Sequence, residues 1–129
     1  MLSGCGTASP RFTPRESISR ESAEVASHQL VGIASYYADE FHGRTTSNGE
    51  IYDMHALTAA HKTLPFNTRV RVHNLENNKT IIVRVNDRGP FKDDRVIDVS
   101  LAAAKQLGLI ANGTARVRLE ILEFGSDAR

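Results

Sequence analysis

The sequence has a single cysteine, Cys5, among its 129 residues, and it has no tryptophan. One cysteine cannot form an internal disulfide, and it leaves no material for a zinc ribbon or a C-x-x-C redox motif. No stretch approaches the roughly 18 apolar residues that a membrane-spanning helix needs. Lys and Arg number 16 against 15 Asp and Glu, so the basic excess of a nucleic-acid-binding protein is absent. What remains is the composition of one ordinary folded domain.

The first 29 residues differ in composition from the rest of the chain. Residues 2–5 read L-S-G-C, which is similar to a bacterial lipobox, where the cysteine becomes the first mature residue and carries lipid. Residues 6–29 are rich in Ser, Thr, Pro and charged side chains, with too little apolar surface to offset the entropy of ordering. We predict a disordered tether, either behind a lipidated Cys5 that holds the domain at a membrane or as a plain tail with an incidental cysteine. The folded domain is expected to span 30–124, followed by a short tail at 125–129.

Alternating apolar residues indicate several short strands beyond this tether. The clearest signal is a hairpin, in which Val70 and Val72 form one apolar face and Ile81, Val83 and Val85 form another across a polar turn. Further strands are predicted at 31–38, 96–99 and 115–121.

One short helix is predicted over 101–107, where Ser100 is placed to cap its start and Gly108 to end it. Residues 54–60 are apolar and fit either a helical turn or a strand. Many short strands, polar turns and one or two short helices favour a mainly β fold. A small closed barrel is expected because closure removes the exposed edges of the sheet. Parallel crossovers through long helices are not expected, since no segment is long enough to form one.

Polar residues that could carry chemistry concentrate in two loops, one around Glu50 and one around Asp87. Two carboxyl groups can act as general acid and base on a glycosidic bond when their surroundings separate their pKa values. The residues alone leave structural interpretations open. Glu50 could belong to a solvated turn, and Asp87 could bond its own backbone in an Asx-turn.

His61 could orient a carboxylate or shuttle protons, and Asp53 could hold its tautomer, although both could also be purely structural. The chain lacks an H-E-x-x-H motif, a Gly-rich phosphate loop and a G-x-S-x-G elbow, so we predict neither a metal nor another cofactor. Tyr37 and Phe91 could stack on the apolar faces of sugars, or they could pack in the core, because aromatic residues are few.

Four segments together carry a specific resemblance. These segments read GIASYY (32–37), FHGRTTSNGE (41–50), ALTAAHKTLP (56–65) and VRVNDRGPF (83–91). They closely resemble the rare lipoprotein A (RlpA) family, and DRVIDVS (94–100) fits as well, so that the resemblance covers about 31–122. It implies a six-stranded double-psi β-barrel, a fold shared with expansins, at the periplasmic face of the bacterial envelope.

The resemblance also implies an activity and its residues. Enzymatic members are lytic transglycosylases that cleave peptidoglycan strands lacking stem peptides and leave 1,6-anhydro ends during cell separation. Carried over by motif, Glu50 and His61 match positions that the family needs for activity. Asp87 matches the barrel aspartate that looks like the proton donor in related double-psi enzymes, and Asp53 is expected to have a supporting role. Whether Glu50 or Asp87 gives the proton stays open. The expected sugar-binding residues are Tyr37, Asn48, Arg88 and Phe91.

The expected partner is therefore a peptidoglycan strand, bound by a monomer that touches a membrane only through Cys5. The alternative from another class is an expansin-like module that binds wall glycan without cutting it. A metal-dependent wall hydrolase is a more remote third interpretation.

Overall fold

A computed structural model of the protein describes residues 30–92 and 94–126. Cys5, the predicted tether and the last three residues lie outside this part of the chain. The strands are β1 (Val31–Tyr36), β2 (Thr58–Ala60), β3 (Arg69–Asn74), β4 (Thr80–Asp87), β5 (Arg95–Val99) and β6 (Ala115–Glu123). The helices are the short 3-10 helix η2 (Asp39–Phe41) and the α-helix α2 (Leu101–Leu107).

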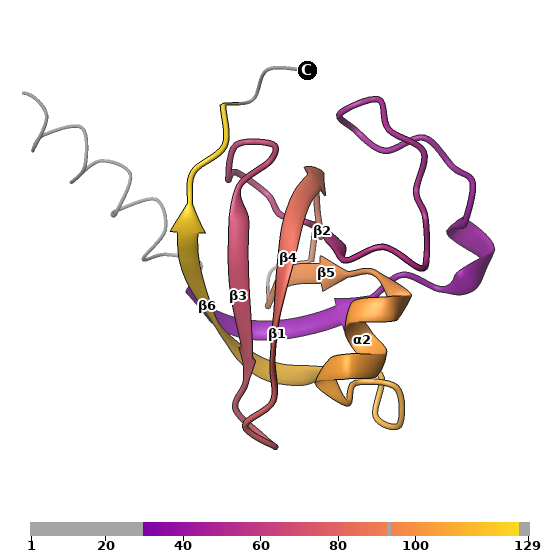
Figure 1. Cartoon of the computed structure of the whole chain (residues 1–129). Helices are drawn as coiled ribbons and strands as arrows, with labels where there is room; N and C mark the ends of the chain where they lie inside the picture. Colours follow the sequence, from indigo (N-terminus) through magenta and orange to yellow (C-terminus); the bar gives the residue numbers. More distant parts are fainter. Residues whose placement is uncertain (1–29, 93, 127–129) are drawn as a thin grey trace, which may run out of the picture.

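The six strands close into one barrel in the order β1-β5-β2-β4-β3-β6 (Figure 1). This arrangement confirms the predicted mainly β fold and the closed barrel. The hairpin is present as well: β3 and β4 are antiparallel, with Val70 opposite Val83 and Val72 opposite Ile81. Among the described residues, no helix combines the length and apolar character required to cross a membrane.

Two strand pairs of the barrel are parallel, β1 with β5 and β2 with β4. The chain between β2 and β4 forms β3, and the chain between β1 and β5 forms β2, β3 and β4, so neither parallel pair is joined by a long helix. The parallel pairs meet where β2 runs antiparallel to β5. In the barrel β2 therefore lies between β4 and β5, although β4 and β5 follow each other directly in the sequence.

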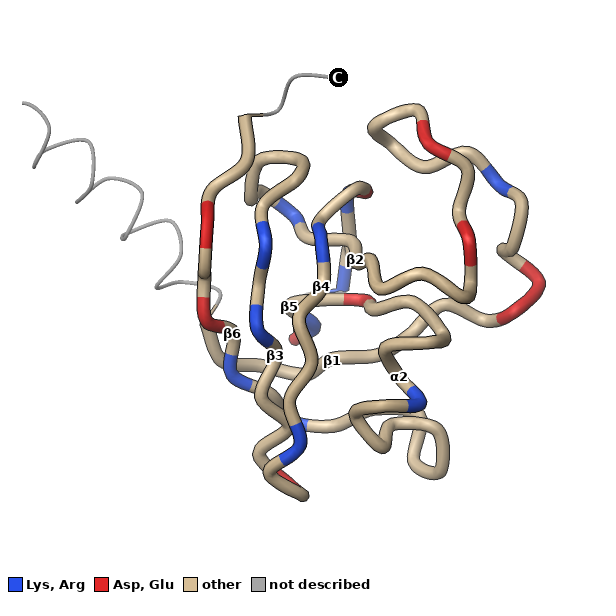
Figure 2. The backbone as a smooth tube through the Cα atoms, in the orientation of Figure 1, with Lys and Arg blue, Asp and Glu red and all other residues tan. Residues whose placement is uncertain are grey.

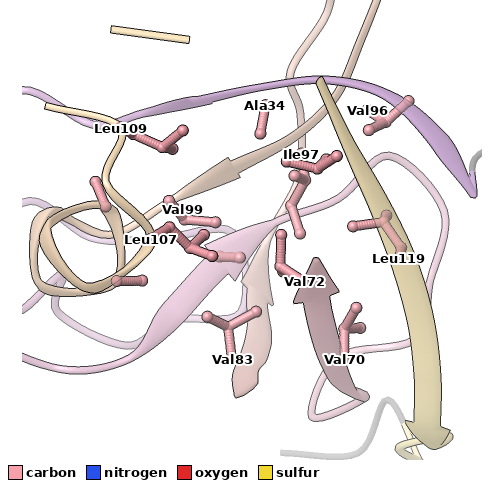
Figure 3. Packing of buried hydrophobic residues seen from close by; sticks show 14 of the residues in the cluster. Ala34, Val70, Val72, Val83, Val96, Ile97, Val99, Leu107, Leu109 and Leu119 are labelled. Atoms are coloured by element: carbon pink, nitrogen blue, oxygen red, sulfur yellow. The ribbon is translucent and has the colours of Figure 1, made fainter. Parts of the chain in front are cut away.

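Buried hydrophobic residues from all six strands form the core of the barrel (Figure 3). Val70, Val72 and Val83 are at most 1% exposed, as the period-2 pattern predicts. Leu107 and Leu109 join the same cluster from α2 and the turn that follows it. The helix therefore covers part of the barrel, and packing holds its two turns in place.

Both ends of α2 are capped as the sequence predicts. The Ser100 hydroxyl accepts a hydrogen bond from the Ala103 N–H at 3.3 Å and donates one to the Ala56 carbonyl at 2.6 Å. Gly108 ends the helix in the left-handed region, with φ 77°. Ser100 thereby ties the helix to the segment that leads into β2.

The long connection between β1 and β2 extends away from the barrel on the side where η2 lies (Figure 1). Within the apolar stretch 54–60, only Thr58–Ala60 forms a strand. The Asn48 N–H bonds the Asn86 carbonyl at 3.3 Å, and the Tyr52 hydroxyl accepts a bond from the Leu101 N–H at 3.0 Å. These two contacts fasten the connection to the end of β4 and the start of α2.

Candidate functional site

A cavity of about 670 Å³ opens where this connection meets the barrel. Its size falls within the range typical of small-molecule sites. Five aromatic side chains contribute to its walls: Tyr36, Tyr37, Phe41, Tyr52 and Phe91. Its polar lining includes Ser35, Asp87, Arg88, Arg95 and Asp98. Aromatic faces beside a few convergent polar groups are suited to binding sugars.

A row of paired residues across four strands forms one side of the cavity. Ser35 on β1 pairs with Asp98 on β5, Asp98 pairs with Ala60 on β2, and Ala60 pairs with Asp87 on β4. All four residues line the cavity. At the usual strand spacing, the Cα atoms of Asp87 and Asp98 lie about 10 Å apart. The row therefore places two carboxyl groups in one cavity with only the small Ala60 between them.

Asp87 is the most heavily hydrogen-bonded carboxylate of the cavity. Its Oδ1 accepts bonds from the Ser47 hydroxyl at 2.6 Å, the Ser47 N–H at 2.8 Å and the Arg88 N–H at 2.9 Å. Its Oδ2 accepts a bond from the Tyr37 hydroxyl at 2.5 Å. Burial by itself raises the pKa of Asp87, but these donors outweigh it and leave the pKa below its usual value. Asp87 is therefore ionised at neutral pH.

Glu50 faces Arg84 and is not part of the described cavity lining. The Arg84 guanidinium donates two bonds to its carboxylate, at 2.8 and 2.9 Å. Asn86 and Asn48 each donate one more at 3.0 Å. The bond from Arg84 is the largest cause that lowers the pKa of Glu50, to about 2. Because Arg84 and Asn86 alternate with the buried Val83 and Val85 along β4, the Glu50 carboxylate meets the outer side of that strand.

His61 is buried directly beyond β2, with 1% of its surface exposed. Its Nδ1 accepts hydrogen bonds from the Thr63 N–H at 3.2 Å and the Leu64 N–H at 3.1 Å. Burial, followed by the nearby charges of Arg88 and Lys62, lowers the pKa of His61 to about 4. The imidazole is thus neutral at neutral pH. The backbone N–H of His61 also donates to the backbone carbonyl of Asp87 at 3.1 Å, so this turn is fixed to the end of β4.

The remaining predicted site residues fall into two groups. Tyr37, Arg88 and Phe91 line the cavity, and Phe91 is 83% exposed there. Asn48 is buried and bonds Glu50, while Asp53 is exposed and accepts the His55 N–H at 2.9 Å in an Asx-turn.

Arg88 directs its guanidinium at the turn formed by residues 61–66. Its Nη1 donates to the carbonyls of His61 at 3.2 Å and Leu64 at 2.8 Å. The guanidinium carbon also lies 4.0 Å from the centre of the Phe66 ring. Arg88 thereby holds the 61–66 turn against the cavity wall.

Sequence reasoning missed the second carboxylate of the cavity and its partners. The Ser35 hydroxyl donates to Asp98 Oδ1 at 2.5 Å, and Arg95 Nη1 donates to the same hydroxyl at 2.6 Å. Arg95 Nε lies 3.8 Å from Asp98 Oδ1 and is buried without a hydrogen-bond partner among the described residues. One signal in the sequence could have revealed this cluster: Ser35 and Asp98 are polar residues, and each lies inside an otherwise apolar predicted strand.

In the described ranges, no group of three or more His, Cys, Asp or Glu side chains is arranged to hold a metal ion. Carboxyl, hydroxyl and guanidinium groups line the cavity. The carboxyl groups can exchange protons with a sugar and stabilise positive charge that develops on it.

The barrel topology and this cavity define a double-psi β-barrel protein. A family model described as "Lytic transglycolase" matches residues 29–119, and the chain belongs to this family. The likeness to solved structures is one of fold. The chain matches the Streptomyces papain inhibitor with a TM-score of 0.59 and 25% identity, over 73% of this chain and 94% of that one. It matches the apo expansin of Clavibacter michiganensis with a TM-score of 0.56 and 17% identity, over 75% and 52% respectively.

Curated relatives share much more sequence. The chain is 62% identical over 95 residues to the endolytic peptidoglycan transglycosylase RlpA of Campylobacter jejuni, covering 74% of this chain and 34% of the relative. It is 52% identical over 121 residues to the protein of that name from Neisseria meningitidis, covering 94% and 48%. The chain thus spans about a third to a half of the length of these two relatives.

Proposed function

We propose that this domain is the catalytic domain of an endolytic peptidoglycan transglycosylase. It would cleave the bond between N-acetylmuramic acid and N-acetylglucosamine and leave a 1,6-anhydro end. The observation that carries the proposal is the row that brings Asp87 and Asp98 into one aromatic-walled cavity. Family membership and the names of the relatives support the same activity.

Asp87 is the acid and base in this proposal. Its proton passes to the leaving glycosidic oxygen as the bond to C1 breaks, and the resulting carboxylate then takes the proton of the C6 hydroxyl that attacks C1. Because the sugar supplies its own nucleophile, no water-activating carboxylate is needed. A bound strand removes water from Asp87, which favours the protonated form required for the first step. Asp98, beside Arg95, stabilises the oxocarbenium-like transition state from the other side of Ala60.

Glu50 and His61 act through Asp87 as positioning residues. Glu50 is bound to Arg84 and Asn86 on β4 and to Asn48 on the connection, so it fixes residues 46–50, which bring Ser47 to Asp87. His61 holds the turn whose backbone bonds Asp87. A carboxyl group with a pKa of about 2 and no place on the cavity wall is poorly suited to giving up a proton. Asp53 supports this arrangement only through its turn.

The test incubates the purified chain with peptide-free glycan strands and follows the products by mass spectrometry. Asp87→Asn is expected to abolish anhydro ends, and Asp98→Asn to lower kcat by about a hundredfold. Glu50→Gln should retain measurable turnover. Asp94→Asn is the matched control, because it removes a carboxylate directly before β5, the strand of Asp98, but outside the described cavity lining. Ordinary reducing ends in place of anhydro ends would point to hydrolysis and contradict the proposal.

The second candidate is an expansin-like module that binds wall glycan without cutting it. The observation in its favour is that hydrogen bonds hold the cavity's Asp87 ionised, which leaves little proton donor before substrate binds. In the same assay, wild-type chain that retains glycan strands but produces no new ends would establish this alternative.

Three finer features also belong to the proposal. The enzyme prefers strands without stem peptides, works as a monomer in cell-wall remodelling at cell separation, and is held at the periplasmic face of the outer membrane by lipid on Cys5. Metabolic labelling with a fatty-acid analogue, compared between the natural protein and its Cys5→Ser variant, tests the anchor. Sedimentation of the purified domain tests the monomer.

A further inference from the structure

The charged residues that line the cavity are unequal in sign. Four are basic and two are acidic: Arg44, Arg88, Lys92 and Arg95 against Asp87 and Asp98. The whole chain has a formal charge of only +1, so this surplus is a local property of the cavity. A cavity with surplus positive charge favours a ligand that carries negative charge.

Two of these basic side chains are already engaged by the protein. Arg95 bonds the Ser35 hydroxyl at 2.6 Å and lies 3.8 Å from Asp98, which compensates its charge. Arg88 donates to two backbone carbonyls and stacks on Phe66. The surplus that a ligand meets is therefore contributed mainly by Arg44 and Lys92, and neither makes a salt bridge with a carboxylate among the described residues.

Arg44 stands out within its own segment. Residues 37–57, which connect β1 to β2, contain four acidic residues and one Lys or Arg. Figure 2 shows these acidic positions in red and the basic one in blue. None of these four acids is part of the described cavity lining, whereas Arg44 is. Its guanidinium carbon lies 5.4 Å from the centre of the Phe41 ring, another lining residue. A guanidinium stacked on a ring keeps its N–H edge available for a carboxylate.

Lys92 follows the exposed Phe91, and both line the cavity. The Lys62 ammonium donates to the Lys92 carbonyl at 3.2 Å, which adds a third positive charge near this part of the rim. Arg44 and Lys92 thus reach the cavity from two separate segments of the chain, each next to an aromatic lining residue.

We infer that Arg44 and Lys92 form a subsite that binds the lactyl carboxylate of N-acetylmuramic acid. The inference rests on the proposed function and names the group that this function would recognise. In a strand without stem peptides this carboxylate is free and negative. In a strand with stem peptides it is an amide, which has no charge and carries a bulky substituent. The subsite therefore selects peptide-free strands by charge, in addition to any selection by size.

The experiment separates charge from size by changing the substrate. One sample of peptide-free strands is left untreated, and in a second sample carbodiimide coupling converts the lactyl carboxylates to methylamides. Methylamides are neutral but small. Affinity for fluorescently labelled strands and the rate of anhydro-end formation are measured separately with the purified chain. The wild-type chain is expected to bind and cleave the free-acid strands at least about tenfold better.

Three variants complete the design. The double variant Arg44→Gln, Lys92→Gln should reduce the preference for free-acid strands to less than about twofold. The single variant Arg44→Lys, which keeps both positive charges, should retain most of this preference. Lys105→Gln, on α2 and outside the described cavity lining, removes one positive charge and should leave the preference unchanged. Added salt should weaken binding of the free-acid strands more than binding of the methylamides.

The possible outcomes lead to different conclusions. Equal affinity of the wild-type chain for both substrates, or an unchanged preference in the double variant, would overturn the subsite. Absence of anhydro ends from every substrate would overturn the proposed function instead, while the affinity ratio would still decide the subsite. Thermal unfolding of each variant establishes that the comparison is made between folded proteins.

Discussion

The Tyr37 hydroxyl donates a 2.5 Å hydrogen bond to Oδ2 of Asp87, fifty residues away in the sequence. Burial is the largest cause that raises the pKa of Tyr37 far above its ordinary value, and the charges of Asp87 and Asp98 add to it. The hydroxyl consequently stays protonated and remains a donor at every working pH. Tyr37 also packs edge-on against Tyr52, with ring centres 4.8 Å apart, which holds the hydroxyl in place. One aromatic residue thus positions the carboxylate that the proposed reaction needs.

Replacing Tyr37 by Phe should weaken catalysis and move its pH dependence. Loss of a donor to the ionised carboxylate raises the pKa of Asp87. Because the reaction needs the proton of Asp87, the alkaline limb of the kcat profile, where that proton is lost, shifts to higher pH. We expect kcat to fall by about tenfold, the size of one charge-assisted hydrogen bond, with KM changed less. Ser47→Ala removes another donor to the same carboxylate and should shift the limb in the same direction. An unmoved limb in both variants would disprove the positioning role.

Glu50 should make the stability of the domain sensitive to acid. Its pKa falls from 4.5 to about 2 on folding, so its contribution is present above pH 4.5 and is lost as the pH falls toward 2. Because both side chains of the Glu50–Arg84 pair are more than a third exposed, solvent screening limits the contribution to about 1 kcal/mol.

Urea unfolding of wild type and Glu50→Gln at several pH values measures this contribution. The variant should be less stable at pH 7, and the difference should vanish at pH 2. Glu123→Gln, a change at an exposed position on β6, controls for the loss of one negative charge. A difference that persists at pH 2 would mean that shape, and not charge, is responsible.

His61 should contribute stability that falls on mild acidification. Its pKa is 6.5 when unfolded and about 4 when folded, so only the unfolded chain gains a proton between these values. Stability is therefore complete above pH 6.5 and declines as the pH falls toward 4. NMR of labelled imidazoles should show His61 neutral at pH 5.5. A resonance that titrates near pH 6.5 would contradict the buried, neutral assignment.

Substitution of His61 should distinguish its acceptor role from its volume. His61→Ala leaves the Thr63 N–H and the buried Leu64 N–H without this acceptor and creates a cavity, which together destabilise by about 2–4 kcal/mol. His61→Asn supplies an oxygen acceptor and should recover part of that loss. Denaturant unfolding measures both variants. Equal losses in the two would show that volume alone matters.

Gly32 allows β1 to approach β5 closely. A Cβ added at this position would lie 2.4 Å from Cγ1 of Val96, so the Val96 side chain or one of the two strands must shift. We expect Gly32→Ala to destabilise the domain by about 1–3 kcal/mol. Gly32→Ala combined with Val96→Ala should recover stability relative to the sum of the two single changes, as a double-mutant cycle would show. Additive losses would mean that the two residues do not meet.

Much of the fold could be predicted from local patterns. Val70 and Val72 on β3 and Val83 on β4 are buried because strand side chains alternate, and this alternation is visible in the sequence. Ser100 and Gly108 end the helix as their conformational preferences require. The 54–60 segment was ambiguous, because a strand as short as Thr58–Ala60 shows no clear period.

The candidate site was only partly predictable. Motif resemblance selected Glu50, His61 and Asp87, and their roles stay predictions. It did not reveal that Asp98 shares the cavity with Asp87 or that Glu50 is bound to Arg84 outside it. These facts depend on contacts between segments that are far apart in the chain.

By itself the sequence determined the strands, the hairpin, the helix caps and the supply of acidic, basic and aromatic side chains. Tertiary structure alone decided which carboxylates face the cavity and which basic residues accompany them. The physical reason is strand register: a shift of one residue turns every side chain of a strand to the opposite face, and register between distant strands is set by the closed barrel as a whole.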